Sequence, residues 1–138
     1  MPARDLFHQA VRQALIKDGW TITDDPLLIT FGGYDLYIDL GAERLIAAER
    51  GREVIAVEVK SFIGTSAVTE FHAALGQYLN YRLALEQQLP YRTLYLAVPK
   101  DTYASFFLST FAQAACARYE VSMLTYDPQQ EVIIQWTK

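Results

Sequence analysis

The chain has 138 residues, of which 51% are hydrophobic and 20% are charged. This length and composition are typical of one globular domain, and they exclude a disordered tail, a fibrous protein and a linker. The single cysteine, Cys116, excludes a disulfide framework and a cysteine-rich zinc site, so we expect a reducing, cytoplasmic compartment. A net charge of −4 argues against a protein that binds nucleic acid through a basic surface, but it permits an enzyme that meets phosphates through a metal ion.

No signal sequence or membrane span is expected. The N-terminal segment carries charges where a secretory signal needs an apolar block, and no window of about 18 uninterrupted apolar residues occurs. Linkers, internal repeats and low-complexity stretches are also missing from the sequence. We therefore expect one domain over residues 1–138.

The first half of the chain is expected to hold one helix followed by strands. Apolar residues recur at helical spacing from Ala3 to Lys17, and Gly19 closes that segment. Pro26 forbids a central strand at its own position. The predicted strand segments are, in order, 20–23, the two apolar runs of 27–40 that Gly32-Gly33 divides, and a hairpin of 45–49 and 54–61 that turns near Arg50-Gly51.

The second half alternates helices and strands. A long helix is predicted from Ala67 to about Leu89, with Ser66 as its N-cap and Pro90 as its end. The remaining predicted elements are a buried strand over 93–98, a helix capped by Asp101 that runs to about Arg118, and closing strands over 121–125 and 132–136. Such an order predicts an α/β fold with a central mixed β-sheet flanked by helices.

The segment Val54-Ile-Ala-Val-Glu-Val-Lys-Ser-Phe is the most informative part of the chain. Side chains alternate along a strand, so Glu58 and Lys60 share one face with Val54 and Ala56. Both faces are apolar up to residue 57, which predicts a central strand covered on both sides. Burying either charge alone would cost several kcal/mol, so the pair indicates a functional site. Alternatively, the two charges simply neutralise each other at the end of the strand.

Other polar residues are expected to converge on Glu58. Asp39 ends a strand-like segment and Glu43 follows closely. In the hairpin register that we expect, residue 49 opposes residue 53 and residue 44 opposes residue 58, so either acid could arrive near Glu58. On the long helix, Gln77 and Tyr81 are four residues apart and therefore lie on one face.

Three features, taken in order, resemble the PD-(D/E)XK nuclease-like superfamily: an acid, Glu58-Val-Lys60 on a strand, and Gln77-Tyr-Leu-Asn-Tyr81 on a helix. The last of these resembles the RecB-like branch of that superfamily. Four runs, taken in order, resemble the XisH family of fdxN element excision controlling factors over roughly residues 6–136. They are Ile46-Ala-Ala-Glu-Arg, Ile55-Ala-Val-Glu-Val-Lys-Ser-Phe, Ala74-Leu-Gly-Gln-Tyr and Tyr95-Leu-Ala-Val-Pro.

This resemblance implies a restriction-endonuclease-like (PD-(D/E)XK) core and a metal site. Asp39 and Glu58 would bind Mg²⁺ (or Mn²⁺) through carboxylate oxygens, with the main-chain carbonyl of Val59 as a third ligand. Glu43 competes with Asp39 for the role of the second acid, because the 19 positions from Asp39 to Glu58 make a long two-strand connection.

The other site residues implied by the resemblance are Lys60, Gln77 and Tyr81. Lys60 would orient a metal-bound water or stabilise the charge that develops on phosphorus, while Gln77 and Tyr81 would support the site or contact the substrate backbone. The acid that several branches take from their first helix has no clear match here, because that helix offers Asp5, His8 and Gln9 in its place. His8 and His72 are instead expected to be surface or satisfied core histidines, and Cys116 is expected to pack within a helix.

The resemblance also implies a biological role. XisH-like proteins are cyanobacterial and are associated with excision of a DNA element during heterocyst differentiation, beside a recombinase and a small partner, XisI. Two functions follow from it: a Mg-dependent endonuclease that acts on DNA, or a catalytically inactive accessory module that binds a XisI-like partner protein. Self-association into a homo-oligomer is a third expectation, and no membrane partner is expected.

Overall fold

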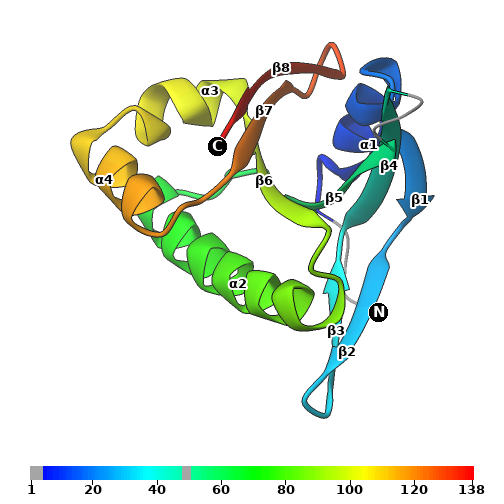
Figure 1. Cartoon of the computed structure of the whole chain (residues 1–138). Coiled ribbons are helices and arrows are strands. Elements are labelled where there is room, and N and C mark those ends of the chain that lie inside the picture. The colour runs from blue at the N-terminus through cyan, green and yellow to red at the C-terminus, as the bar shows by residue number, and fades with distance from the viewer. Residues whose placement is uncertain (1–4, 48–50) are drawn as a thin grey trace.

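The computed structural model of this chain describes residues 5–47 and 51–138 (Figure 1). The helical segments are α1 (His8–Lys17), α2 (Ala67–Gln88), α3 (Lys100–Thr102), the π-helical turn η1 (Tyr103–Phe107) and α4 (Thr110–Arg118). The strands are β1 (Thr21–Asp24), β2 (Leu27–Phe31), β3 (Tyr34–Ile38), β4 (Leu40–Ala47), β5 (Gly51–Val59), β6 (Thr93–Pro99), β7 (Met123–Asp127) and β8 (Val132–Thr137).

Six of the strands form one mixed sheet in the order β1-β4-β5-β6-β7-β8. The pairs β5–β6 and β6–β7 are parallel, and the other neighbours are antiparallel. Strands β2 and β3 form a separate hairpin, which extends beyond the six-stranded sheet in Figure 1. The predicted central mixed sheet is therefore confirmed, with β5 in its interior.

Helices cover both faces of the sheet. On one face, Val11 and Leu15 of α1 pack with Ile55 and Val57 of β5. On the other face, α2 and α4 share a second core with Ala56, which also belongs to β5. The alternation predicted for this strand thus holds, and Glu58, two residues after Ala56, lies at the end of the face that α2 covers.

Helix α2 has the predicted bounds for the predicted reason. The hydroxyl of Ser66 accepts a hydrogen bond from the Thr69 amide at 3.3 Å, and the helix ends two residues before Pro90. Tyr78 is buried on its inner face, where its hydroxyl donates to the Leu94 carbonyl at 3.1 Å and accepts from the Ser122 amide at 3.0 Å. Through these two bonds one side chain connects α2 to β6 and to the start of β7.

The predicted register of the β4–β5 hairpin is wrong. Arg44 lies opposite Glu53, not opposite Glu58, and the pairing continues to Leu40 opposite Val57. Both strands are longer than the pattern predicted. Ala47 and Gly51 are the paired residues nearest the connection between the strands, so this connection is centred earlier in the chain than expected. Arg50, placed in the predicted turn, lies outside the described residues.

The predicted helix from Asp101 to Arg118 is interrupted. The chain passes from α3 into η1, and a new helix, α4, begins after Leu108. The hydroxyl of Ser109 caps α4 by accepting from the Ala112 amide at 3.2 Å, while Pro99 takes the N-cap position predicted for Asp101. Apolar spacing alone did not indicate this second cap.

Within the described residues, no helix combines the length and apolar character needed to cross a bilayer.

Candidate functional site

Two carboxylates meet where β3 ends and β5 ends. Asp39 lies between β3 and β4, and its Oδ2 accepts a hydrogen bond from the Val59 amide at 2.7 Å. Glu58 is the penultimate residue of β5, and its Oε1 accepts from the Asp39 amide at 3.2 Å. Each carboxylate is thus held by the backbone of the other segment, which leaves Asp39 Oδ1 and Glu58 Oε2 without a hydrogen bond to that backbone.

The hairpin register brings Asp39 to this position. Because Leu40 pairs with Val57, the residues directly beyond that pair are Asp39 and Glu58. Glu43 instead pairs with Val54, and its carboxylate forms an ion pair with Arg52. Of the two acids considered from the sequence, the structure brings Asp39 to Glu58 and holds Glu43 elsewhere.

Lys60 lies at the rim of the same site. Its ammonium group is 3.6 Å from Glu58 Oε2, and its side chain is 30% exposed. The backbone at Lys60 is held on both sides, because its amide donates to the Ala97 carbonyl at 3.1 Å and its carbonyl accepts from the Tyr126 hydroxyl at 3.0 Å. Glu58, near the end of β5, therefore lies inside the protein, and Lys60, the first residue after the strand, lies at the border with solvent.

Burial makes Glu58 a weak acid. The residue is only 4% exposed, and desolvation, followed by the nearby charge of Asp39, raises the pKa of Glu58 from 4.5 to about 8. Lys60 acts in the opposite direction but does not offset burial. Asp39 and Glu58 thus bring together two carboxyl groups of the kind that can ligate a divalent cation.

His8 lies next to this site, whereas the sequence predicted a surface or satisfied core histidine at this position. It is 2% exposed, its Nε2 lies 2.7 Å from Asp25 Oδ1, and its Nδ1 lies 3.8 Å from Asp39 Oδ1. That second distance is too long for a hydrogen bond, and Nδ1 is without a hydrogen-bond partner among the described residues. Asp39 and then Asp25 raise the pKa of His8 against the effect of burial.

The sequence did hold a signal for the burial of His8. It lies three and seven residues before Val11 and Leu15, within the buried stripe of α1. Spacing of this kind predicts burial, but it does not predict the charged partners, since Asp25 and Asp39 lie 17 and 31 residues away along the chain.

Gln77 and Tyr81 lie together on α2, as their spacing predicted. The Gln77 amide donates to the Tyr81 hydroxyl at 2.9 Å. Burial, followed by the charge of Glu58 and with a smaller contribution from Asp39, raises the pKa of Tyr81. The Tyr81 phenol is therefore within electrostatic reach of both carboxylates, and α2 contributes to the surroundings of the site.

A small pocket of about 240 Å³ lies beside Lys60. It is lined by Asp5, Lys60, Ser61, Phe62, Glu70, Ala73 and Ala74. Asp5, from the segment before α1, accepts from the Ser61 amide at 3.0 Å, and Ala74 is buried where α2 approaches the sheet. The small residues on α2 leave this space open next to the lysine ammonium group.

The donor atoms suit a hard divalent cation. Mg²⁺ is commonly held by one or two carboxylates and several waters, and Asp39 Oδ1 and Glu58 Oε2 are the two oxygens available here. In the part of the chain that the structure describes, no three side chains of His, Cys, Asp or Glu form a group that could hold a metal ion. A cation at this site would therefore depend on the two carboxylates, a backbone oxygen such as that of Val59, and water.

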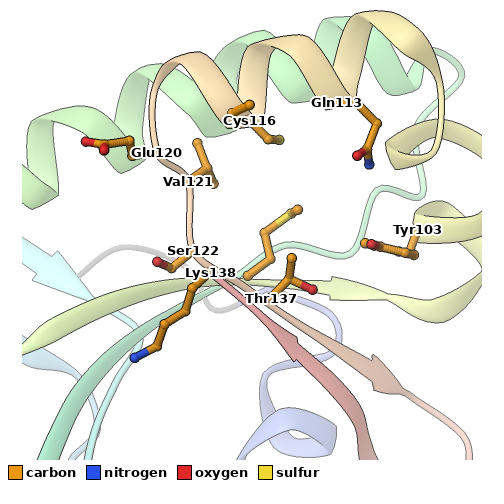
Figure 2. A pocket seen from close by; sticks show the side chains of 10 residues that line it. Tyr103, Gln113, Cys116, Glu120, Val121, Ser122, Thr137 and Lys138 are labelled. Carbon is orange, nitrogen blue, oxygen red and sulfur yellow. The ribbon is translucent and has the colours of Figure 1, made fainter.

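The larger pocket, about 450 Å³, lies away from these acids (Figure 2). It separates α4, which contributes Gln113 and Cys116, from Tyr103 and from Thr137 at the end of β8. Cys116 is half-buried, and burial raises the pKa of its thiol, in agreement with the packing role expected for it. None of the predicted site residues lines this pocket.

Comparison with known proteins identifies the family. A family model described as "XisH protein" matches residues 1–134. The crystal structure of an XisH family protein from Nostoc punctiforme is similar, with 53% identity, a TM-score of 0.88 and coverage of 97% of this chain and 100% of that one. The crystal structure of an fdxN element excision controlling factor protein from Anabaena variabilis is also similar, with 52% identity, a TM-score of 0.88 and coverage of 98% and 100%. Among curated proteins, none matches this chain. The chain belongs to the XisH family.

Proposed function

We propose that this protein is a DNA element excision controlling factor with a PD-(D/E)XK nuclease-like core, and that it acts as a Mg²⁺- or Mn²⁺-dependent endonuclease in a site-specific DNA rearrangement. The observation that supports it most directly is the pair of reciprocally held carboxylates, Asp39 and Glu58, with Lys60 two residues further along. The role in excision rests on the similarity to the Anabaena variabilis protein that bears this description. A recombinase and a small XisI-like protein are the proposed partners.

In this proposal the carboxylates of Asp39 and Glu58 would hold the cation, together with the main-chain carbonyl of Val59. When bound, the cation would supply Lewis acidity at the scissile phosphate and lower the pKa of a coordinated water. Glu58 must lose its proton to ligate, so metal binding releases a proton at neutral pH. The raised pKa of Glu58 makes that release large enough to measure.

The other residues act on the substrate side of the site. The Lys60 ammonium group, 30% exposed and 3.6 Å from Glu58, would stabilise the negative charge that develops on phosphorus. Gln77 and Tyr81 would present their linked polar groups toward the same place from α2. The backbone hydrogen bonds at Lys60 fix the point from which its side chain would extend toward a phosphate.

Titration calorimetry with Mn²⁺ tests the metal site. The wild type is expected to bind, and Asp39→Ala and Glu58→Ala are expected to lose binding. Glu43→Ala is the matched control, since it also removes one carboxylate from the same hairpin, and it is expected to bind like the wild type. Cleavage of plasmid DNA in the presence of Mn²⁺ should follow the same order. No binding by the wild type at millimolar Mn²⁺ would refute the endonuclease.

The second candidate is a catalytically inactive accessory module that binds a partner protein. Large apolar side chains exposed near the start of α4 favour it, since Leu108 is 59% and Phe111 is 51% exposed. This function predicts a stoichiometric complex with a small XisI-like protein that forms without DNA and is unchanged by Glu58→Ala. A complex lost in Leu108→Ser and Phe111→Ser but kept in Glu58→Ala would support it.

A further inference from the structure

A line of four charged or ionisable side chains runs from the candidate metal site toward the surface. Asp39 Oδ1 lies 3.8 Å from His8 Nδ1, His8 Nε2 lies 2.7 Å from Asp25 Oδ1, and Asp25 Oδ2 lies 3.0 Å from Arg12 Nε. The exposed fraction of the side chain rises from 3% at His8 to 33% at Arg12. His8, in the middle of the line, is thus the most deeply buried member.

Three separate segments supply this line. His8 and Arg12 are four residues apart on α1 and so share one face of the helix. Asp25 follows β1, which pairs antiparallel with β4 up to Asp24 opposite Gly41. That pairing brings Asp25 close to the start of β4, which Asp39 directly precedes. The arrangement therefore depends on the sheet register and on the docking of α1, and not on a local turn.

The contacts exceed what a core histidine needs. One hydrogen bond, to Asp25, fixes the ring, and an apolar residue would fill the same volume without desolvating charges. The ring is nevertheless oriented so that Nδ1, which has no hydrogen-bond partner among the described residues, lies 3.8 Å from Asp39 Oδ1. In many metal sites, side chains that do not touch the metal contact its carboxylate or imidazole ligands in this way and so fix their orientation.

We propose that Asp25 is a positioning residue of the candidate metal site: its contact with His8 Nε2 fixes the imidazole ring, the Nδ1 edge of that ring packs against Asp39 Oδ1 at 3.8 Å and limits the movement of the Asp39 carboxylate, and Arg12 fixes Asp25 in turn. This proposal rests on the proposed function, because its consequence is the orientation of a metal-binding carboxylate. Asp25 itself touches neither the cation nor the substrate.

Mn²⁺ affinity measured by titration calorimetry is the first test. Asp25→Ala is expected to raise the dissociation constant about 10- to 100-fold. Asp25→Asn is expected to stay within a few-fold of the wild type, because the amide oxygen still accepts from His8 Nε2. Glu53→Gln is the control: it removes a carboxylate from a partly exposed ion pair with Arg44 near the far end of β5, and it should leave the affinity unchanged. The melting temperature of each metal-free variant establishes that it is folded.

A second measurement, made without metal, separates this proposal from the proposed function. If Asp25 acts on Asp39 through His8, the losses of unfolding free energy in Asp25→Ala and Asp39→Asn are not additive. The coupling should disappear in a His8→Gln background, since glutamine offers an amide group near the Nε2 position but no nitrogen near the Nδ1 position.

The outcomes are distinct. If the wild type binds Mn²⁺ and Asp25→Ala binds it equally well, the positioning role is overturned and the metal site stands. If the wild type fails to bind but the coupling between Asp25 and Asp39 is present, the metal site is overturned and the positioning of Asp39 stands. Absence of both binding and coupling overturns both proposals.

Discussion

Replacing Glu58 with glutamine should stabilise the metal-free protein, and increasingly so as the pH rises. The glutamine side chain keeps the shape and can still accept the hydrogen bond from the Asp39 amide, but it carries no charge. Burial raises the pKa of Glu58 from 4.5 to about 8. Between these two values the folded protein retains a proton that the unfolded chain has lost.

The sign follows from this difference in bound protons. Stability falls with rising pH wherever the folded state binds more protons than the unfolded state, so the wild type loses stability from about pH 4.5 to pH 8. At about 1.4 kcal/mol per pKa unit, the advantage of Glu58→Gln is near zero at pH 4, roughly 3 kcal/mol at pH 7 and at most about 5 kcal/mol at pH 9. Other titrating groups, including His8, are present in both proteins, and their contributions largely cancel.

Urea denaturation of metal-free wild type and Glu58→Gln at pH 4.5, 7 and 9 measures this advantage. Glu53→Gln, on the same strand with a side chain that is 30% exposed, should differ from the wild type by no more than about 0.5 kcal/mol at any pH. A difference between Glu58→Gln and wild type that stays constant from pH 4.5 to pH 9 would contradict this prediction, because it would mean that Glu58 ionises over the same pH range in the folded protein as in the unfolded chain.

Three further predictions concern the stability of the fold. Tyr126→Phe removes the hydrogen bond to the Lys60 carbonyl and should cost about 1–3 kcal/mol of unfolding free energy in urea, with the same apolar packing retained. Gly41→Ala should destabilise by about 1–3 kcal/mol, because a Cβ there would lie 2.6 Å from Arg92 Nη1; a melting temperature equal to that of the wild type would contradict it. Ser109→Ala should cost about 1 kcal/mol through loss of the α4 cap, and Ser109→Asp should restore it.

The local patterns were sufficient for most of the elements. The long helix from Ala67 has the expected start because Ser66 is a good N-cap, and it ends just before Pro90. The strand that carries Glu58 and Lys60 is central because both of its faces are apolar. Such features depend on neighbours in the sequence, and they can therefore be predicted from spacing and residue type.

The choice between Asp39 and Glu43 could not be made in this way. An antiparallel register depends on where the connection between two strands is centred, and a shift of a few residues changes which acid faces Glu58. The sequence pattern is compatible with several such positions. Only the paired strands, with Leu40 opposite Val57, brought Asp39 to Glu58 and left Glu43 with Arg52.

The amino-acid pattern alone predicts an α/β fold in which a central strand ends in two charged residues, with an acid upstream and with Gln77 and Tyr81 on one helix face. Which groups meet at that strand end follows only from the folded arrangement: Asp39 meets Glu58, and the buried His8 lies between Asp39 and Asp25. The physical reason is that burial and charge coupling arise between segments distant in the chain. They exist only after the sheet register and the docking of α1 have brought those segments together.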